Sequence, residues 1–268
     1  MLPTKNISGN NKVRITAVII IPIFLICVIV ALVVSTLTGP YHKSRELIRA
    51  IKRQDYETVE SMLESGFDPN VPNTRITKLN GLFETAPDVP IDIAAGLGDL
   101  KSVELLLRYG ANPNHIEGTG SYPLFAAVWN NGENVLEIVK LLVEYGADPD
   151  ELRGDDNVYF WIASRYSAND PDGEMRLKDV MDYLFTTFDE DAQSAKGNSI
   201  QIWSLTTTAI YSGKNVQLIR YLLDHGGKID YNSSYSGQSF YDYCHEEGRE
   251  RILSIIEEKG GFPEDIEN

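Results

Sequence analysis

A short phrase recurs along this chain and constrains its fold more than any other feature of the sequence. Each copy begins with Gly and continues into Asn or Asp, in most copies followed by Pro and a second Asn or Asp; the copies begin at Gly66, Gly110, Gly146 and, in a weaker form, Gly226. Apolar residues at helical spacing precede every copy. Because Gly adopts the left-handed conformation that ends a helix, and because a residue before Pro disfavours helix, each phrase predicts a helix end followed by a turn.

A second motif predicts where helices begin. Residues 89–95 read Val-Pro-Ile-Asp-Ile-Ala-Ala, and residues 122–128 read Tyr-Pro-Leu-Phe-Ala-Ala-Val. Pro suits the first turn of a helix, where no backbone N–H is needed, and small Ala side chains let neighbouring helices pack closely. Together the two motifs resemble the ankyrin repeat, in which a β-turn precedes two antiparallel helices over about 33 residues.

The spacing of the motifs extends this resemblance over most of the chain. A small residue lies 16 positions before the closing Gly in three segments, namely Ala50–Gly66, Ala94–Gly110 and Cys244–Gly260. The resemblance implies an all-α fold, an ankyrin-repeat solenoid of stacked helix-turn-helix units over residues 43–263. We expect about six repeats, the fourth and the sixth degenerate, and a C-terminal tail at residues 264–268. Cys244 is interpreted as a small core residue.

An apolar stretch precedes the repeats. Residues 15–37 contain no charged residue over 23 positions. At about 1.5 Å per residue, a helix of this length extends roughly 35 Å and exceeds the hydrocarbon core of about 30 Å. We therefore predict one transmembrane helix at residues 15–37, after a short N-terminal tail at residues 1–14. The alternative is a cleaved signal peptide, whose apolar region is usually shorter, about 7–15 residues.

The basic residues that flank this stretch bear on its orientation. Three precede it and five follow it; the eight are Lys5, Lys12, Arg14, Lys43, Arg45, Arg49, Lys52 and Arg53. Basic residues close to a span favour the cytoplasmic side. Because the five later residues are expected in a folded helix beside acidic side chains, we give them less weight. The sequence then favours a cytoplasmic N-terminus and an extracytoplasmic repeat domain.

Composition and motif content narrow the classes of function. The chain has 39 acidic against 24 basic residues and a formal net charge of −15, which argues against nucleic-acid binding because that requires clustered cations. The two cysteines, Cys27 and Cys244, are far apart, and no nucleophile motif, phosphate-binding loop or metal-ligand spacing occurs. We therefore expect no enzyme activity, no cofactor, no metal and no small-molecule substrate.

The resemblance to ankyrin repeats implies a protein-binding module whose partner contacts the concave face formed by the first helices and the turns. The second position after the small residue of each first helix should point into that face, and three repeats place Trp129, Arg165 and Tyr211 there. These residue types dominate many interfaces. The three side chains either form a partner-binding stripe or pack against one another or under an insertion, and both interpretations stay open.

An insertion of about 11 residues lies between the first two repeats, near residues 74–88. It contains Arg75, Lys78 and Phe83, which place basic and apolar groups on an otherwise acidic domain. Such a segment is either a recognition loop or a solvated insertion.

The combined prediction is a single-pass membrane protein that recruits a protein partner to the bilayer as a scaffold or adaptor. The alternative function is that of an inhibitor or immunity protein whose acidic groove blocks a basic enzyme or toxin.

Overall fold

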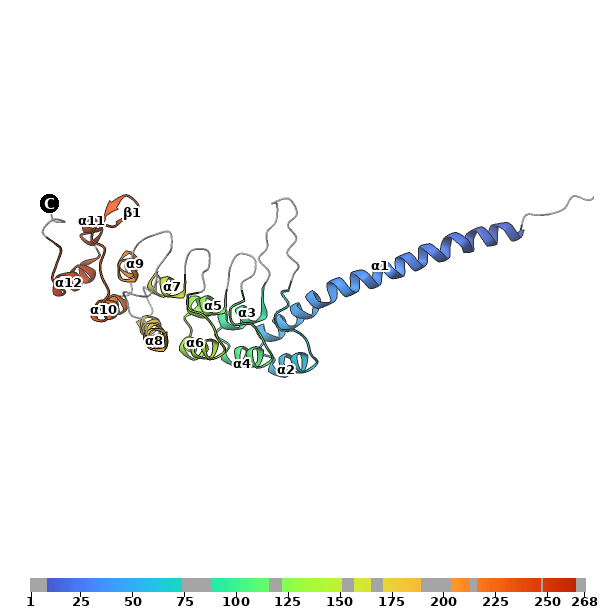
Figure 1. Cartoon of the computed structure of the whole chain (residues 1–268), viewed down its shortest axis with the longest axis horizontal. Helices are drawn as coiled ribbons and strands as arrows, with labels where there is room; N and C mark the ends of the chain where they lie inside the picture. Colours follow the sequence, from blue (N-terminus) through green and yellow to red (C-terminus); the bar gives the residue numbers. More distant parts are fainter. Residues whose placement is uncertain are drawn as a thin grey trace, which may run out of the picture.

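The computed structural model describes the backbone of residues 9–73, 88–115, 122–150, 157–164, 171–188, 204–212, 216–246 and 248–263. It shows one long helix that leads into a row of paired helices (Figure 1). Within the long helix, side chains are described at residues 23–30, 32–33 and 39–52.

The helices of the row form two layers. The first helices of the pairs are α1 (Gly9–Lys52), α3 (Pro90–Gly96), α5 (Pro123–Asn130), α7 (Val158–Ser164), α9 (Leu205–Ser212) and α11 (Phe240–Cys244). The second helices are α2 (Tyr56–Glu64), α4 (Leu100–Arg108), α6 (Val135–Glu144), α8 (Pro171–Phe188), α10 (Val216–Asp224) and α12 (Glu250–Glu258). Two short antiparallel strands, β1 (Ser234–Tyr235) and β2 (Gln238–Ser239), precede α11 and pair Ser234 with Ser239 and Tyr235 with Gln238.

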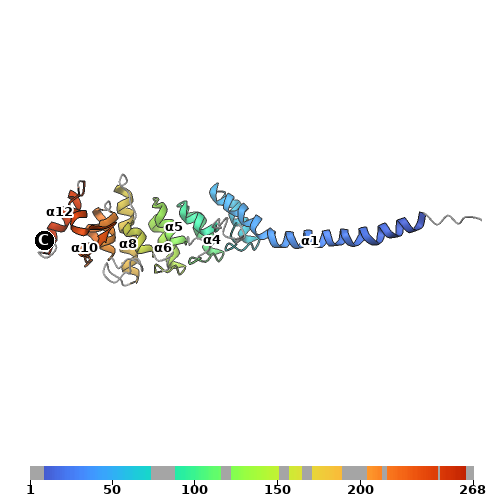
Figure 2. The ribbon, with the colours of Figure 1, turned by 90° about the horizontal axis from the view of Figure 1, so that it is seen from above.

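Each helix contacts its partner and its counterparts in the adjacent pairs. From α1 to α9 the first helices contact one another in order, as the second helices do from α2 to α12. Figure 2 shows these pairs succeeding one another along the axis, and Figure 1 shows the row bowed, with the first helices on its hollow side. The described residues thus form the predicted all-α repeat solenoid, apart from the small β1–β2 hairpin.

Small residues allow the first helices to pack closely. Pro90 begins α3 without a side-chain cap, and Ile91, Ala94 and Ala95 are buried on that helix. A Cβ atom placed on Gly96 would lie only 3.7 Å from the Cβ of Ala126 on α5. The Ala-rich motif therefore sets the separation between adjacent first helices.

The Gly phrase closes the second helices α2, α4, α6 and α10 as predicted. Gly110 has a φ of +88°, and Gly66, Gly146 and Gly226 are also left-handed. After Gly110, the Ala111 amide donates to the carbonyl of Leu106 at 2.9 Å, which satisfies a carbonyl at the helix end.

The last Asn of the phrase connects one repeat to the next. Asn70 Nδ2 donates to the Gly110 carbonyl at 3.0 Å, and Asn70 Oδ1 accepts from the Asn112 amide at 2.7 Å. Asn114 repeats this arrangement one repeat later, donating to the Gly146 carbonyl at 2.7 Å and accepting from the Asp148 amide at 2.8 Å. We call these four bonds the Asn ladder.

The first helix of the array is longer than the other first helices, because the chain that precedes the repeat is also helical. In α3 and α5, Pro90 and Pro123 mark the first turn, whereas the equivalent position in α1 is Glu46. The chain N-terminal to Glu46 is helical back to Gly9, and this helix includes Gly39 and Pro40, two residue types that disfavour a helix interior.

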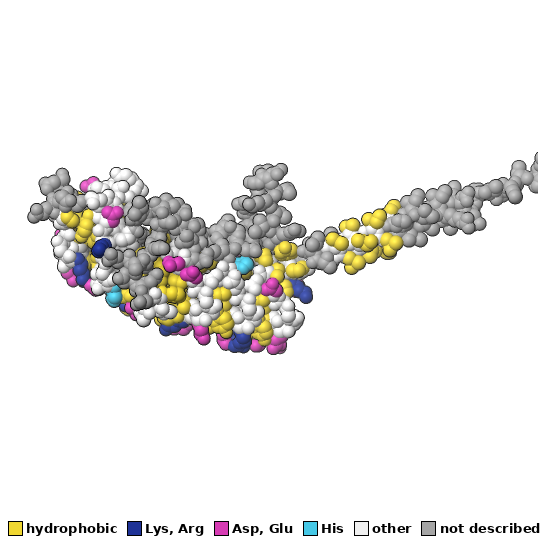
Figure 3. Space-filling view, viewed as in Figure 1, with side chains coloured by type: hydrophobic (Ala, Val, Ile, Leu, Met, Phe, Trp, Pro, Cys, Tyr) yellow, Lys and Arg dark blue, Asp and Glu magenta, His cyan; other side chains and the backbone are white. Residues whose placement is uncertain are grey.

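Between Ile23 and Val33, nine large apolar side chains of α1 are exposed, with exposed fractions of 38–66% (Figure 3). Within the described part of the chain, none of the helices combines the length and the apolar character that crossing a bilayer requires. The predicted membrane helix at residues 15–37 lies partly outside the described side chains, and it is not confirmed.

Candidate partner-binding surface

Among the described residues of the first helices α3, α5, α7, α9 and α11, Trp129 is the most exposed aromatic residue. It lies at the end of α5, at the predicted position, and half of its side chain (50%) is exposed. The Phe125 ring lies one turn earlier on the same helix, with its centroid 5.6 Å from that of Trp129, and Trp161 on α7 lies 5.8 Å away in an edge-on arrangement. Phe125 and Trp161 are themselves 4.9 Å apart. Aromatic pairs at such distances each contribute about 0.5–1.5 kcal/mol beyond burial, so the exposed indole is held in place from two repeats.

Tyr211 occupies the equivalent position on α9, but it is covered. Only 7% of its side chain is exposed, and its hydroxyl is hydrogen-bonded to Ser233 Oγ at 2.9 Å. The Tyr235 ring of strand β1 stacks on it at 5.3 Å, and Tyr243 Oη donates to its carbonyl. Burial raises the pKa of the Tyr211 phenol, although its bond to Ser233 opposes this change.

The β1–β2 hairpin therefore determines which aromatic side chain is exposed at this end of the array. It covers the Tyr211 ring and leaves Tyr235 exposed above it. Tyr235 is not among the residues predicted from the sequence. Its signal is the Ser236-Gly237 pair that follows, since both residues are left-handed and form the turn of a hairpin.

The remaining predicted binding residues cannot be placed in the same way. Arg165, Arg75, Lys78 and Phe83 lie outside the described residues. The structure thus places Trp129 on the surface and Tyr211 beneath it, and it does not bring them together into one exposed stripe. Participation of these six residues in binding stays a prediction.

A basic segment stands out at the start of the array. The five residues of this segment are Lys43, Arg45, Arg49, Lys52 and Arg53. All are exposed, and no carboxylate of a described residue lies within 4.0 Å of their charged nitrogens. Elsewhere, some cations pair with carboxylates of an adjacent repeat, as Arg220 does with Glu258 at 2.8 Å.

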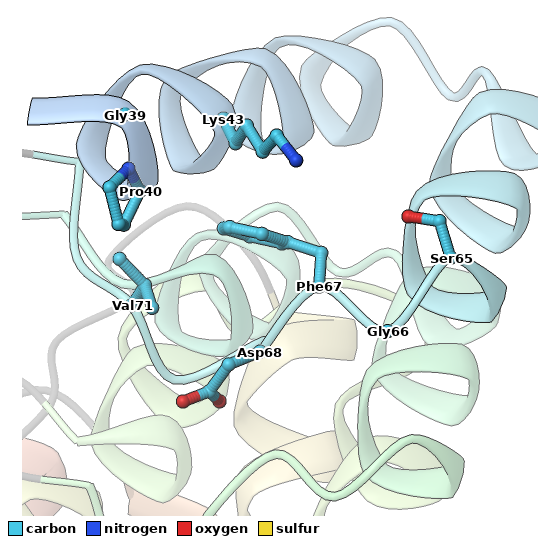
Figure 4. Close-up of a pocket in the computed structure, with 8 residues that line it drawn as sticks. All are labelled: Gly39, Pro40, Lys43, Ser65, Gly66, Phe67, Asp68 and Val71. Atoms are coloured by element: carbon cyan, nitrogen blue, oxygen red, sulfur yellow. The ribbon is translucent and has the colours of Figure 1, made fainter. Parts of the chain in front are cut away.

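A pocket of about 400 Å³ opens beside this basic segment. It lies between the α1 turn that contains Gly39, Pro40 and Lys43 and the loop after α2 that contains Phe67 and Val71 (Figure 4). The loop is fixed to α1 by the buried Ser44, whose hydroxyl donates to the Val71 carbonyl at 2.5 Å. The pocket is therefore bounded by two segments that are bonded to each other.

Two buried titratable groups lie away from these surfaces. Burial raises the pKa of the Cys244 thiol to about 12, so this side chain stays a neutral core residue, as its sequence position suggested. Burial, followed by the nearby Asp88 charge, raises the pKa of Asp92 to about 8. The described residues contain no group of three or more His, Cys, Asp or Glu side chains placed to hold a metal ion.

Comparison with known proteins agrees with this architecture. Residues 47–153 match the family model described as ankyrin repeats (3 copies). This part of the chain is therefore an array of ankyrin repeats, the class of fold that the helix pairs and closing glycines define.

A relative has been characterised in the fruit fly. The ARF GTPase-activating protein Git of Drosophila melanogaster is 32% identical to this chain over 94 residues. The matched segment is 35% of this chain but spans only 12% of the length of the fly protein. The similarity thus concerns a segment the size of a few repeats, and ankyrin repeats indicate a protein–protein interaction module.

Proposed function

We propose that the chain holds a protein partner on the first-helix side of its repeats, with Trp129 as the main contact, and that it does so as a scaffold or adaptor attached to a membrane. The observation that carries the first part is the half-exposed Trp129 indole, supported from behind by Phe125 and Trp161. A rigid, partly exposed Trp loses little conformational entropy on binding, and Trp is the residue type most enriched among interface hot spots.

The experiment compares Trp129→Ala with Tyr145→Ala in the full-length chain. Tyr145 is a matched control because its side chain is 44% exposed and because the residue lies at the C-terminal cap of α6, in the layer of second helices. Proteins captured from a detergent extract are identified by mass spectrometry and quantified for both variants. We expect Trp129→Ala to lose a partner that Tyr145→Ala retains, with a loss of at least tenfold, since hot-spot truncations cost about 2 kcal/mol or more. Equal capture by both variants would refute a contact at Trp129.

The same capture separates the adaptor from the inhibitor. An adaptor leaves the activity of its partner intact, whereas an inhibitor or immunity protein abolishes it. An assay of the captured protein with and without the repeats distinguishes the two functions.

Attachment to the membrane is supported by the exposed apolar segment of α1. The nine exposed apolar side chains lie within eleven consecutive positions, Ile23–Val33, and so surround the helix on every side. A helix that is apolar on all sides favours an apolar medium over water. No charged residue occurs in the sequence from residue 15 to residue 37.

Leu25→Asp combined with Ile29→Asp tests this attachment in the full-length chain. Each Asp near the centre of a span opposes insertion by about 2.5–3.5 kcal/mol. We expect the double variant to leave the membrane pellet during alkaline fractionation, while the control Leu97→Asp, at an exposed leucine of the repeats, stays with it. If the unaltered chain is already in the supernatant, the attachment is refuted.

The basic segment also bears on orientation. From the sequence, its five cations receive less weight because they are expected in a folded helix beside acidic side chains, but none of the five is paired with a described carboxylate. With full weight, five cations on the repeat side outnumber the three on the other side. We therefore propose that the repeats lie on the cytoplasmic side, opposite to the orientation that the sequence favours. Protease protection in sealed vesicles tests this orientation, and digestion of the repeats from the extracytoplasmic side would refute it.

A further inference from the structure

The pocket beside α1 has a composition that the other repeats do not reproduce. After the closing Gly, the second and third repeats have Ala111 and Ala147, and both are buried. The first repeat has Phe67 at this position, and its ring is partly exposed and faces the space between Pro40 and Lys43 (Figure 4). A large apolar side chain thus replaces a small one at the pocket.

The walls of the pocket differ in polarity. Pro40, Phe67 and Val71 supply apolar surface, while the Lys43 side chain lies above the Phe67 ring, and its ammonium group is not paired with a carboxylate of a described residue (Figure 4). Asp68 also borders the pocket, but its carboxylate points away and its Oδ1 accepts from the Asn70 amide at 2.9 Å. One cation above an apolar floor suits a ligand that has an anionic group next to apolar carbons.

The position of the pocket along α1 indicates where such a ligand would come from. Residue 37 ends the proposed membrane segment, and Lys43 follows six residues later, about 9 Å along the helix. The bilayer with its headgroups exceeds the hydrocarbon core by about 5–8 Å on each side, so this distance places the Lys43 backbone close to the outer edge of the headgroup layer. The rest of the basic segment continues on the same helix.

We propose that this pocket binds the headgroup of an anionic phospholipid, with the Lys43 ammonium on the phosphate and the first acyl carbons against Phe67 and Pro40. This inference rests on the proposed membrane attachment. Binding would fix the height of the first repeat relative to the bilayer surface. A free inorganic phosphate offers the same anion without the apolar part, so the experiment compares the two.

The experiment uses native mass spectrometry of the full-length chain released from a neutral detergent. Phosphatidylglycerol, phosphatidylcholine or inorganic phosphate is added, and the fraction of chains that retain one ligand is measured. The test variant is Lys43→Gln, and the matched control is Lys52→Gln, which removes the same charge from the same helix about 14 Å farther along. Both residues are exposed, so neither change disturbs the core.

We expect phosphatidylglycerol to be retained about tenfold better than phosphatidylcholine, and Lys43→Gln to abolish this preference, since a charge-assisted bond accounts for a difference of this order. Lys52→Gln should keep the preference. Equal retention by the two variants, or competition by millimolar inorganic phosphate, would overturn the proposal. Alkaline fractionation of the same samples separates the two failures: a chain that stays in the membrane without selecting a lipid refutes only the pocket, whereas a chain in the supernatant refutes the attachment.

Discussion

Removal of one side chain of the Asn ladder tests whether this ladder holds adjacent repeats together. Asn114→Ala deletes both bonds that join the second repeat to the third, one to the Gly146 carbonyl at 2.7 Å and one from the Asp148 amide at 2.8 Å. The substitution leaves the helices and their apolar contacts unchanged. Any loss of stability therefore reports on the turn.

The expected magnitude follows from the surroundings of the two bonds. A neutral hydrogen bond contributes about 0.5–1.5 kcal/mol net. Gly146 and Asp148 are both exposed, so water replaces the lost partner and the low part of this range applies to each bond. We expect a total loss of about 1–2 kcal/mol, which corresponds to a decrease in Tm of about 2–8 °C for an array of this size.

Urea denaturation followed by circular dichroism at 222 nm measures this loss, with Asn232→Ala as the control. Asn232 is an exposed Asn in the turn before α11, and among the described residues no hydrogen bond of its side-chain amide occurs. If the free energies of unfolding of the two variants differ by less than about 0.3 kcal/mol, the ladder does not stabilise the array. A lower slope for Asn114→Ala would show that the repeats no longer unfold together, since each contacts only its neighbours.

Three further substitutions test the core and the turns. The pKa of Asp92 is about 8 in the folded chain against 3.8 in the reference state, so the folded chain binds the proton more tightly and stability should fall as pH rises from about 4 to 8. Asp92→Asn should abolish this fall, which is measured by comparing denaturation midpoints at pH 5 and pH 8. An unchanged dependence of the midpoint on pH would contradict the raised pKa of Asp92. Gly227→Ala introduces the Ala of the second and third repeats, yet its Cβ would lie 2.2 Å from Thr206 Oγ1, so calorimetry should show a destabilisation of about 1–3 kcal/mol instead of a gain. Gly110→Ala meets no atom within 4 Å but keeps a φ of +88°, and it should cost about 1–2 kcal/mol in the urea assay through backbone strain alone.

Local sequence signals predicted the elements of the fold because their causes are local. Gly110 ends a helix through its own backbone conformation, and Pro90 begins one through its own ring. The unbroken α1 was not accessible in this way, because Gly39 and Pro40 lie between the apolar stretch and the first repeat and locally disfavour a helix.

The Asn ladder was not predicted because it depends on how the repeats stack. The recurrence of Asn70 and Asn114 was visible, but their partners are backbone groups 40 and 32 residues away, which only the spacing between stacked turns brings into reach. The third repeat has Asp150 at this position, which lacks the amide donor and instead accepts from Asn157 Nδ2 at 3.2 Å.

The candidate site was predicted in part for a similar reason. Trp129 and Tyr211 occupy equivalent positions in their repeats, yet one is exposed and the other is covered by the β1–β2 hairpin. What covers a residue depends on the segment that folds over it, and helical spacing contains no information about that segment.

The continuity of α1 has a mechanical consequence. Its 44 residues extend about 66 Å, and its last turns are at the same time the first helix of the array, so no joint separates the two parts. A partner bound to the repeats would therefore be unable to reorient freely relative to α1, as it could on a flexible linker. A force applied to that partner would instead be transmitted along the continuous helix as a torque on the N-terminal part of α1.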